Sequence, residues 1–293
     1  MGCPLRFRGS TLKRSYDGVS LTARGHDGLG GRAGCLHRLH RSGLGDLRGQ
    51  RRIPRRPALR AAGRSARFRR PVSVQASFTG RSDDTQPVEL AVTDVRSSSR
   101  AHCQRVALTQ LGRTCAEVTI WSAAGGTSYE HATVEEVPDP ASVPSSWDRL
   151  GEEARKDDFG FRSHLQERPL KWTEDWLNRP GGAPVYDCWL LLEGGLGSRD
   201  AWTFAGFVAI VCDIFPSQAA VRGHTHQDSR YVPLTLSLSI SLGEPPDDLD
   251  RVFCQAASPL AGGGHASGTV TVRDRSGRPI ATSVQQNLLR PIA

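Results

Sequence analysis

Hydrophobic and polar positions alternate most regularly near the C-terminal end of the chain. Leu236, Leu238, Ile240 and Leu242 fall on one side, and Thr235, Ser237, Ser239 and Ser241 on the other. A period of two is typical of a strand with one buried face. Turn residues divide the sequence that follows into similar segments. The pattern predicts four strands in an antiparallel meander, at Tyr231–Leu242, Asp250–Ala257, His265–Asp274 and Pro279–Leu289.

A similar order of segments occurs roughly 160 residues earlier in the chain. Strands are predicted there at Pro71–Phe78, Val88–Val95, Gln104–Gln110 and Thr114–Trp121. Any two meanders have similar strand patterns. These two copies also share the order of their punctuating residues: a proline, an acidic turn, a strand that begins with His, and a Gly-Arg turn. In this alignment Pro71 corresponds to Pro233. The repeat predicts a tandem fold with a pseudo-twofold axis.

A predicted helix separates the two copies. Two strands are expected first, at Phe159–Arg168 and Val185–Glu193, and a buried helix follows at Asp200–Phe215. Asp200 is a suitable N-cap, and Pro216 is expected to end the helix. Strands, an apolar helix and then a long antiparallel sheet is the order of a hotdog fold, in which the sheet wraps around one helix.

The last predicted strand carries a more specific similarity. Its sequence, Ser276-Gly-Arg-Pro-Ile-Ala-Thr-Ser-Val-Gln-Gln-Asn-Leu-Leu-Arg290, resembles the final strand of the double-hotdog acyl-CoA thioesterases (the thioesterase II, thioesterase-like family), approximately dGrlvAstvQegliR. An Asp near the end of the helix and a Thr after Pro233 also match. The resemblance covers residues 159–290 well and residues 65–135 weakly. It implies an α+β tandem hotdog that hydrolyses acyl-CoA to free acid and CoA, without a metal or redox cofactor, as a homo-oligomer.

The resemblance assigns three candidate catalytic residues, Asp213, Thr235 and Gln285. It implies that Asp213 accepts a proton from water, while Thr235 and Gln285 hold that water and polarise the thioester. The sequence alone supports Asp213 because it interrupts an apolar run, and burying a carboxylate is costly outside functional sites. The alternative is a residue at the end of the helix that reaches solvent or caps a loop.

Strand alternation gives less direct support to Thr235 and Gln285. It places Thr235 on the Ser-rich face of its strand, and Gln285 on a polar face with Ala281, Ser283 and Asn287. Both could also be solvent-facing strand positions, and Gln286 competes with Gln285 for the role. The first copy has Ile120 where Gln285 would align, so only the second copy is expected to carry the site.

Other motifs do not support a different chemistry. His224-Thr-His226 lacks a paired carboxylate or the cysteine spacing of a metal site. Gly194-Gly-Leu-Gly197 lacks the strand–loop–helix context of a dinucleotide site and is expected to form a turn. A G-x-S-x-G elbow is absent, which disfavours a Ser-His-Asp hydrolase. Trp172 and Trp176 are expected to be core or interface residues rather than a ligand cage.

The positive charge is concentrated at the N-terminal end. Residues 1–70 contain 18 Arg or Lys and 3 Asp, and the other residues contain 20 basic and 27 acidic side chains. The predicted globular part is therefore acidic. The basic segment could be a transit peptide or an arm that binds nucleic acid. We favour a poorly ordered segment, and nucleic acid is not an expected partner.

Cysteine use and apolar runs indicate the cellular setting. The 7 cysteines contain no CxxC pair, which favours reduced, buried thiols in an intracellular, cytoplasmic protein, with organellar targeting by the basic segment as the alternative. The longest apolar run, Phe204–Cys212, is too short to span a bilayer, so no membrane partner is expected.

These patterns divide the chain into four parts: an Arg- and Gly-rich segment at 1–64, a first hotdog at 65–135, a linker at 136–158 and a second hotdog at 159–293. Residues 1–70 contain no convincing helix, so the first hotdog is expected to be incomplete. An incomplete first hotdog would favour a second interpretation, a non-catalytic acyl-binding or scaffold protein.

Overall fold

The computed structural model describes residues 35–39, 55–82, 86–126, 129–150, 164–176, 178–196 and 199–291. The first half contains β1 (Cys35–Leu39), α1 (Arg55–Ser65), β2 (Pro71–Phe78), β3 (Val88–Ser97), β4 (Ala101–Gln110) and β5 (Arg113–Ala123). The connection contains η1 (Pro140–Ser142) and α2 (Ser146–Leu150). The second half contains β6 (Leu165–Pro169), β7 (Val185–Leu192), α4 (Ala201–Arg222), β8 (Tyr231–Leu242), β9 (Arg251–Gly262), β10 (His265–Arg273) and β11 (Pro279–Pro291).

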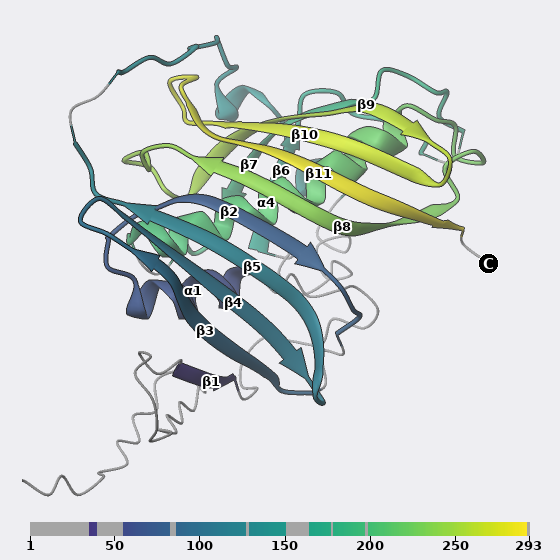
Figure 1. Ribbon diagram of the computed structural model, residues 1–293. Coiled ribbons are helices and arrows are strands. Elements are labelled where there is room, and N and C mark those ends of the chain that lie inside the picture. The colour runs from purple at the N-terminus through teal and green to yellow at the C-terminus, as the bar shows by residue number, and fades with distance from the viewer. Residues whose placement is uncertain are drawn as a thin grey trace, which may run out of the picture.

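The described strands form one antiparallel sheet of 11 strands, in the order β1-β3-β4-β5-β2-β8-β11-β10-β9-β7-β6. The two halves meet where β2 pairs with β8. Read outward from this central pair, β5, β4, β3 and β1 correspond to β11, β10, β9 and β7. The predicted tandem hotdog is therefore confirmed. Figure 1 shows the sheet curving in front of α1 and α4, and these two helices pack against each other.

The predicted meander was wrong in one respect. β8 pairs with β11 rather than with the next strand β9, and β2 likewise pairs with β5 rather than with β3. Alternation shows which face of a strand is buried, but it does not identify the neighbouring strand. The connection at residues 243–250 is long enough to carry the chain across the sheet. The crossing places both first strands in the middle of the sheet, where neither has an open edge.

The expectation that the first hotdog lacks its helix was also wrong. Residues 55–65 form α1, so the boundary predicted at residue 65 falls on the last residue of this helix. Ala58, Leu59 and Ala62 are fully buried in the core. The helix was not predicted because its sequence contains four arginines and a glycine. Its apolar face is nevertheless rich in Ala, the strongest helix former. A side chain at Gly63 would lie 2.8 Å from Trp202 Cγ, so this glycine allows α4 to approach closely.

The central helix α4 is longer than expected. Asp200 caps it as predicted, accepting hydrogen bonds from the backbone N–H groups of Trp202 and Thr203. Pro216 does not end the helix, which continues to Arg222. Buried residues on both sides of the proline, such as Phe215 and Ala219, hold the helix against the sheet and outweigh the local cost. Among the described residues, α4 is long and apolar enough to cross a membrane, but 67% of its apolar window is buried inside the fold.

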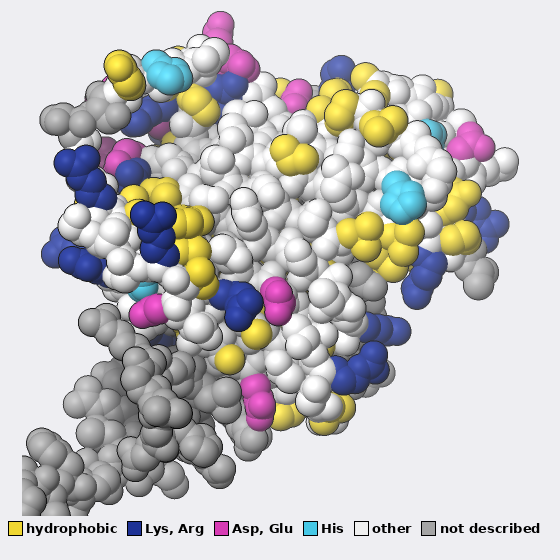
Figure 2. Space-filling view, in the orientation of Figure 1, with side chains coloured by type: hydrophobic (Ala, Val, Ile, Leu, Met, Phe, Trp, Pro, Cys, Tyr) yellow, Lys and Arg dark blue, Asp and Glu magenta, His cyan; other side chains and the backbone are white. Residues whose placement is uncertain are grey.

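The connection between the halves covers part of the outer face of the sheet. Val143 packs there with Trp189 and Phe253, and Trp189 Nε1 donates a hydrogen bond to the carbonyl of Pro138 at 2.8 Å. The rest of the outer face over β8 to β11 is largely uncharged in Figure 2, in line with its many Ser and Thr residues. Cys103, Cys115, Cys188, Cys212 and Cys254 are buried and form no disulfide with one another, which confirms that part of the thiol prediction.

Candidate active site

Asp213, Thr235 and Gln285 converge, although they come from α4, β8 and β11. Thr235 Oγ1 donates a hydrogen bond to Asp213 Oδ1 at 2.8 Å. Gln285 Nε2 lies 2.6 Å from the same carboxylate oxygen and 3.0 Å from Thr235 Oγ1. The Gln285 amide also donates to the backbone carbonyl of Asp213 at 2.8 Å. The structure therefore brings together the three residues that the sequence singled out.

A bulge in β8 turns Thr235 toward this cluster. Ser237 pairs with Gln286, but Thr235 pairs with Asn287, so Leu236 has no opposite residue. A bulge exchanges the faces of the residues on its two sides. Thr235 consequently shares the inner face with Leu238, while Leu236 is 40% exposed. The predicted placement of Thr235 on the Ser-rich face, with Leu236 buried, was wrong because alternation alone cannot locate a bulge.

The polar face of β11 points into the fold. Ser283, Gln285 and Asn287 are buried, with 5%, 1% and 2% of their surfaces exposed, whereas Gln286 is exposed. A solvent-facing position is thus excluded for Gln285, and Gln286 faces away from the cluster. Asn287 Nδ2 donates to Gln285 Oε1 at 3.0 Å. This contact occupies the only acceptor of the Gln285 amide and directs its N–H groups toward Asp213. Sequence reasoning gave Asn287 no role, although its place on the same face as Gln285 was a usable signal.

The cluster has a defined chemical character. The half-buried carboxylate of Asp213 receives hydrogen bonds from two neutral side chains, so it carries the only formal charge among the four residues. A carboxylate held in this way can accept a proton from water. The adjacent hydroxyl and amide groups can donate hydrogen bonds to a carbonyl oxygen on which negative charge develops.

Strand register shows that the described strands of the first half do not carry this cluster. Val74 pairs with Ile120 as Leu238 pairs with Gln285, which confirms the predicted correspondence of Ile120 and Gln285. Pro71 pairs with Ser122 as Thr235 pairs with Asn287. Pro71 therefore corresponds to Thr235, two residues beyond the Pro233 of the sequence alignment. In addition, α1 contains no acidic residue.

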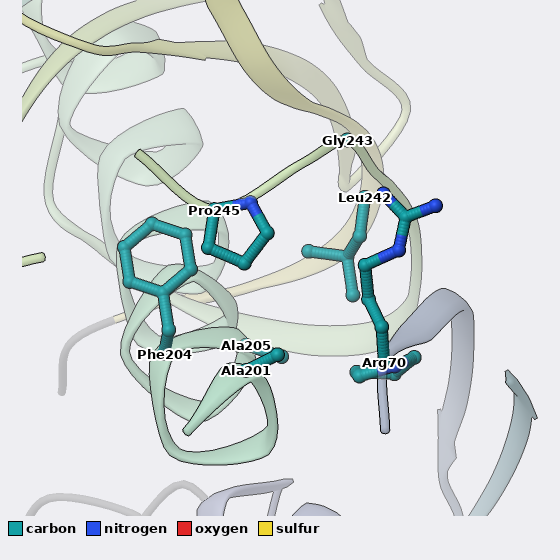
Figure 3. Close-up of a pocket in the computed structure, with 8 residues that line it drawn as sticks. Arg70, Ala201, Phe204, Ala205, Leu242, Gly243 and Pro245 are labelled. Atoms are coloured by element: carbon teal, nitrogen blue, oxygen red, sulfur yellow. The ribbon is translucent and has the colours of Figure 1, made fainter. Parts of the chain in front are cut away.

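A small pocket lies elsewhere, at the N-terminal end of α4. Figure 3 shows Phe204 and Pro245 on one side of it, and Leu242 and Arg70 on the other. Arg70 pairs with Glu244 at 2.5 Å. The pocket has room for roughly one water molecule, and Asp213 is farther along the same helix by about 12 Å. The pocket is thus separate from the polar cluster.

The remaining candidate motifs have structural roles. His226 Nδ1 lies 3.3 Å from Arg179 Nη1, and the described residues contain no group of three or more His, Cys, Asp or Glu that could hold a metal ion. Gly194 and Gly195 form a turn after β7 with positive φ angles, as expected of a turn, and Gly197 lies outside the described residues.

Comparisons with known proteins agree with the fold. The family model of the acyl-CoA thioesterase C-terminal domain matches residues 133–289, and that of the N-terminal domain matches residues 57–123. None of the curated proteins matches the chain.

Three similar solved structures illustrate the agreement. A TesB protein of Mycobacterium avium subsp. paratuberculosis has 22% identity and a TM-score of 0.62, over 80% of this chain and 85% of that one. The acyl-CoA thioesterase II TesB2 of Mycobacterium marinum has 20% identity and a TM-score of 0.64, over 81% and 88%. A hot dog fold protein of Alicyclobacillus acidocaldarius has 14% identity and a TM-score of 0.64, over 89% and 94%.

Proposed function

The chain belongs to the acyl-CoA thioesterase family and is a thioester hydrolase, and from this premise we propose that Asp213, Thr235 and Gln285 are its catalytic residues. The observation that carries the proposal is the convergence of the Thr235 hydroxyl and the Gln285 amide on one carboxylate oxygen of Asp213. These contacts fix the carboxylate against the inner face of the sheet. Its position gives a base that is held in place before the substrate binds.

In the proposed reaction, the Asp213 carboxylate removes a proton from water as the water oxygen attacks the thioester carbonyl carbon. The carbonyl oxygen becomes negatively charged in the tetrahedral intermediate. Collapse of this intermediate breaks the carbon–sulfur bond, and the departing CoA sulfur takes the proton from Asp213. The products are a carboxylic acid and CoA, and the carboxylate of Asp213 is restored.

Thr235 and Gln285 contribute position and hydrogen bonds. Before the reaction they align the Asp213 carboxylate. As Asp213 gains the proton and loses its charge, the Thr235 hydroxyl and one Gln285 N–H turn to the carbonyl oxygen and stabilise the charge that develops there. Asn287 is a positioning residue in this scheme. It binds Gln285 Oε1 and so keeps the Gln285 N–H groups turned toward Asp213 and Thr235.

The test is thiol release from short-, medium- and long-chain acyl-CoAs by the wild type and by Asp213→Asn. A positioned base contributes about 10²–10⁴ in rate, so the variant should lose turnover on that scale while its circular dichroism and Tm stay close to wild type. Equal turnover by the folded variant would contradict the assignment of Asp213. No turnover by the folded wild type on any chain length would favour the acyl-binding or scaffold interpretation. The presence of α1 removes the reason that favoured this alternative at the sequence level.

We also propose that the protein forms a homo-oligomer and acts in the cytoplasm. The family resemblance implies that edge strands of the hotdog sheets pair in the oligomer, but β6 is a poor candidate for this contact, because it has 5 residues and ends in Pro169. Short strands and prolines protect sheet edges against pairing. Light scattering after size exclusion would establish the mass of the assembly, and imaging of the tagged chain would establish its location.

A further inference from the structure

Arg179 is buried and has no carboxylate partner among the described residues. It lies between β6 and β7, and only 5% of its surface is exposed. Its Nη1 donates to the carbonyl of Trp176 at 2.9 Å and lies 3.3 Å from His226 Nδ1, while Nη2 donates to Ser229 Oγ. The guanidinium lies 3.9 Å from the centroid of the Trp176 ring, and its Nε is buried without a hydrogen-bond partner.

A second guanidinium lies beside the first. Arg222, the last residue of α4, lies 5.7 Å from the centroid of the same Trp176 ring and 4.5 Å from that of Tyr186. Its Nη1 donates to Thr173 Oγ1 at 3.5 Å, and its Nε is also buried without a partner. Burial, and next the charge of Arg222, lower the pKa of Arg179. Two positive groups, one buried and one partly buried, therefore lie beside the same Trp176 ring.

Comparison with Arg273 shows that this arrangement is unusual within the fold. Arg273 is buried to the same degree, with 4% exposed, but it forms a salt bridge with Glu135. Neither Arg179 nor Arg222 forms a salt bridge with any described residue. Glu167 accepts a hydrogen bond from the Tyr186 hydroxyl instead. Since an unpaired buried charge is costly, an anion beside Arg179 and Arg222 would stabilise this pair.

The location relates the arginine pair to the proposed catalytic site. Asp213 and Arg222 lie on the same helix, nine positions apart, so they are separated along its axis by about 13 Å. Asp213 faces β8 and β11, whereas Arg222 faces Tyr186 on β7. In an acyl-CoA, a long flexible arm separates the thioester from the phosphate groups. A bound substrate thus holds its phosphate groups at a distance from Asp213, and the arginine pair at the C-terminal end of α4 lies at such a distance.

We propose that Arg179 and Arg222, with the hydroxyl group of Thr173, bind a phosphate group. The Ser229 hydroxyl donates to the carbonyl of His226 and holds Arg179 in place. Guanidinium groups suit phosphate because their N–H groups form charge-assisted and bidentate hydrogen bonds. The substrate is a polyanion, and the chain after residue 70 has 27 acidic against 20 basic side chains. A local positive site offsets that repulsion. Binding of the CoA phosphates at this site rests on the proposed function, and free phosphate is the other source of the same chemistry.

The first arm of the test measures phosphate binding without turnover. Thermal unfolding is followed in inorganic phosphate and in chloride at equal ionic strength, for the wild type, Arg222→Gln and the control Arg105→Gln, an exposed arginine on β4. Phosphate should raise the Tm of the wild type and of the control but not that of Arg222→Gln. Arg222 is the first choice because it is only partly buried, and Arg179→Gln is added if it folds. Asp213→Asn should keep the phosphate effect.

The second arm compares an acyl-CoA with the same acyl group on pantetheine, which has no phosphate. Loss of a charge-assisted contact should raise the KM of Arg222→Gln for acyl-CoA by about tenfold or more, with kcat unchanged. The pantetheine thioester should show no such change. Loss of the Tm effect with an unchanged KM would assign the site to free phosphate. A wild type that phosphate does not stabilise, together with unchanged KM values, would overturn the proposal. The phosphate results are independent of whether Asp213→Asn loses turnover, so the two proposals can fail separately.

Discussion

Thr235 lies directly opposite Asn287 because Leu236 has no partner in β11. This one unpaired residue sets the direction of the Thr235 side chain. It turns the Thr235 hydroxyl inward to Asp213, and it sets Thr235 opposite Asn287, which already shares the inner face of β11 with Gln285. Without the bulge, regular alternation would direct Thr235 away from α4. The contribution of Thr235 to the cluster therefore depends on a local irregularity of β8.

Thr235→Val should lower activity while preserving shape. Valine has nearly the same volume, but it cannot donate to Asp213 Oδ1 or to a developing oxyanion. Loss of one such donor costs about 10²–10³ in kcat. Thr235→Ser should retain most of the activity. Thr282→Val, an exposed β11 position, is the matched control and should behave like wild type in steady-state kinetics. A fully active, folded Thr235→Val would show that the hydroxyl takes no part in the reaction.

Asn287→Asp should lower kcat more than it raises KM. Aspartate cannot donate to Gln285 Oε1, so the Gln285 amide should rotate and present its N–H groups to residue 287. Asp213 and Thr235 would then lose the donor that the wild type provides. Because a hydrogen bond to a charged group contributes about 1.5–3 kcal/mol, we expect a loss in kcat of about tenfold to a hundredfold.

The matched control for this variant is Gln286→Glu. It makes the same amide-to-carboxylate change at the neighbouring position, but on the exposed face of β11. Steady-state kinetics across pH separates the two. Asn287→Asp should add a dependence on the ionisation of the new carboxyl, which Gln286→Glu should lack. Similar kinetics for both variants would mean that Asn287 does not position Gln285.

Some features of the fold could be predicted from the sequence, and others required tertiary information. The strand at Tyr231–Leu242 was predicted with the bounds of β8, because its alternation is long and regular. Strand pairing was not predictable, because the alternation of β8 fits β9 and β11 equally well. The length of α4 was not predicted because a proline such as Pro216 normally ends a helix. Packing of the residues before and after Pro216 against the sheet outweighs this effect, and the sequence does not show that packing. The candidate site followed from the resemblance of the last strand, whereas Asn287 became visible only with the side chains in place.

The five buried cysteines, Cys103, Cys115, Cys188, Cys212 and Cys254, should not react with thiol reagents in the native protein. Burial raises the pKa of the Cys188 and Cys254 thiols well above the usual value, so both remain neutral at the pH of a thiol-release assay. Neutral, inaccessible thiols are poor nucleophiles. Titration of the folded and the denatured chain with a chromophoric disulfide should reveal at least five additional thiols on unfolding. Rapid reaction of all thiols in the native state would contradict the burial of these residues.

Gly268→Ala should destabilise the protein and disturb the catalytic cluster. A methyl group at this position would lie 2.4 Å from Pro216 Cβ, so α4 would have to move away from β10. Overpacking of a core contact costs about 1–3 kcal/mol. Gly262→Ala is the matched control in the adjacent strand β9, because nothing lies within 4 Å of its added methyl group. The free energy of unfolding from denaturant titration should fall for Gly268→Ala only.

The activity of the folded fraction of Gly268→Ala is the more informative measurement. Pro216 follows Asp213 by less than one turn of α4, so a shift of the helix at Pro216 also moves the carboxylate. The Gln285 amide contacts both the backbone carbonyl and the side chain of Asp213, and both distances would lengthen together. We therefore expect kcat per folded molecule to fall, whereas Gly262→Ala should match wild type. Unchanged kcat in a destabilised Gly268→Ala would show that the cluster tolerates movement of the helix that carries its carboxylate.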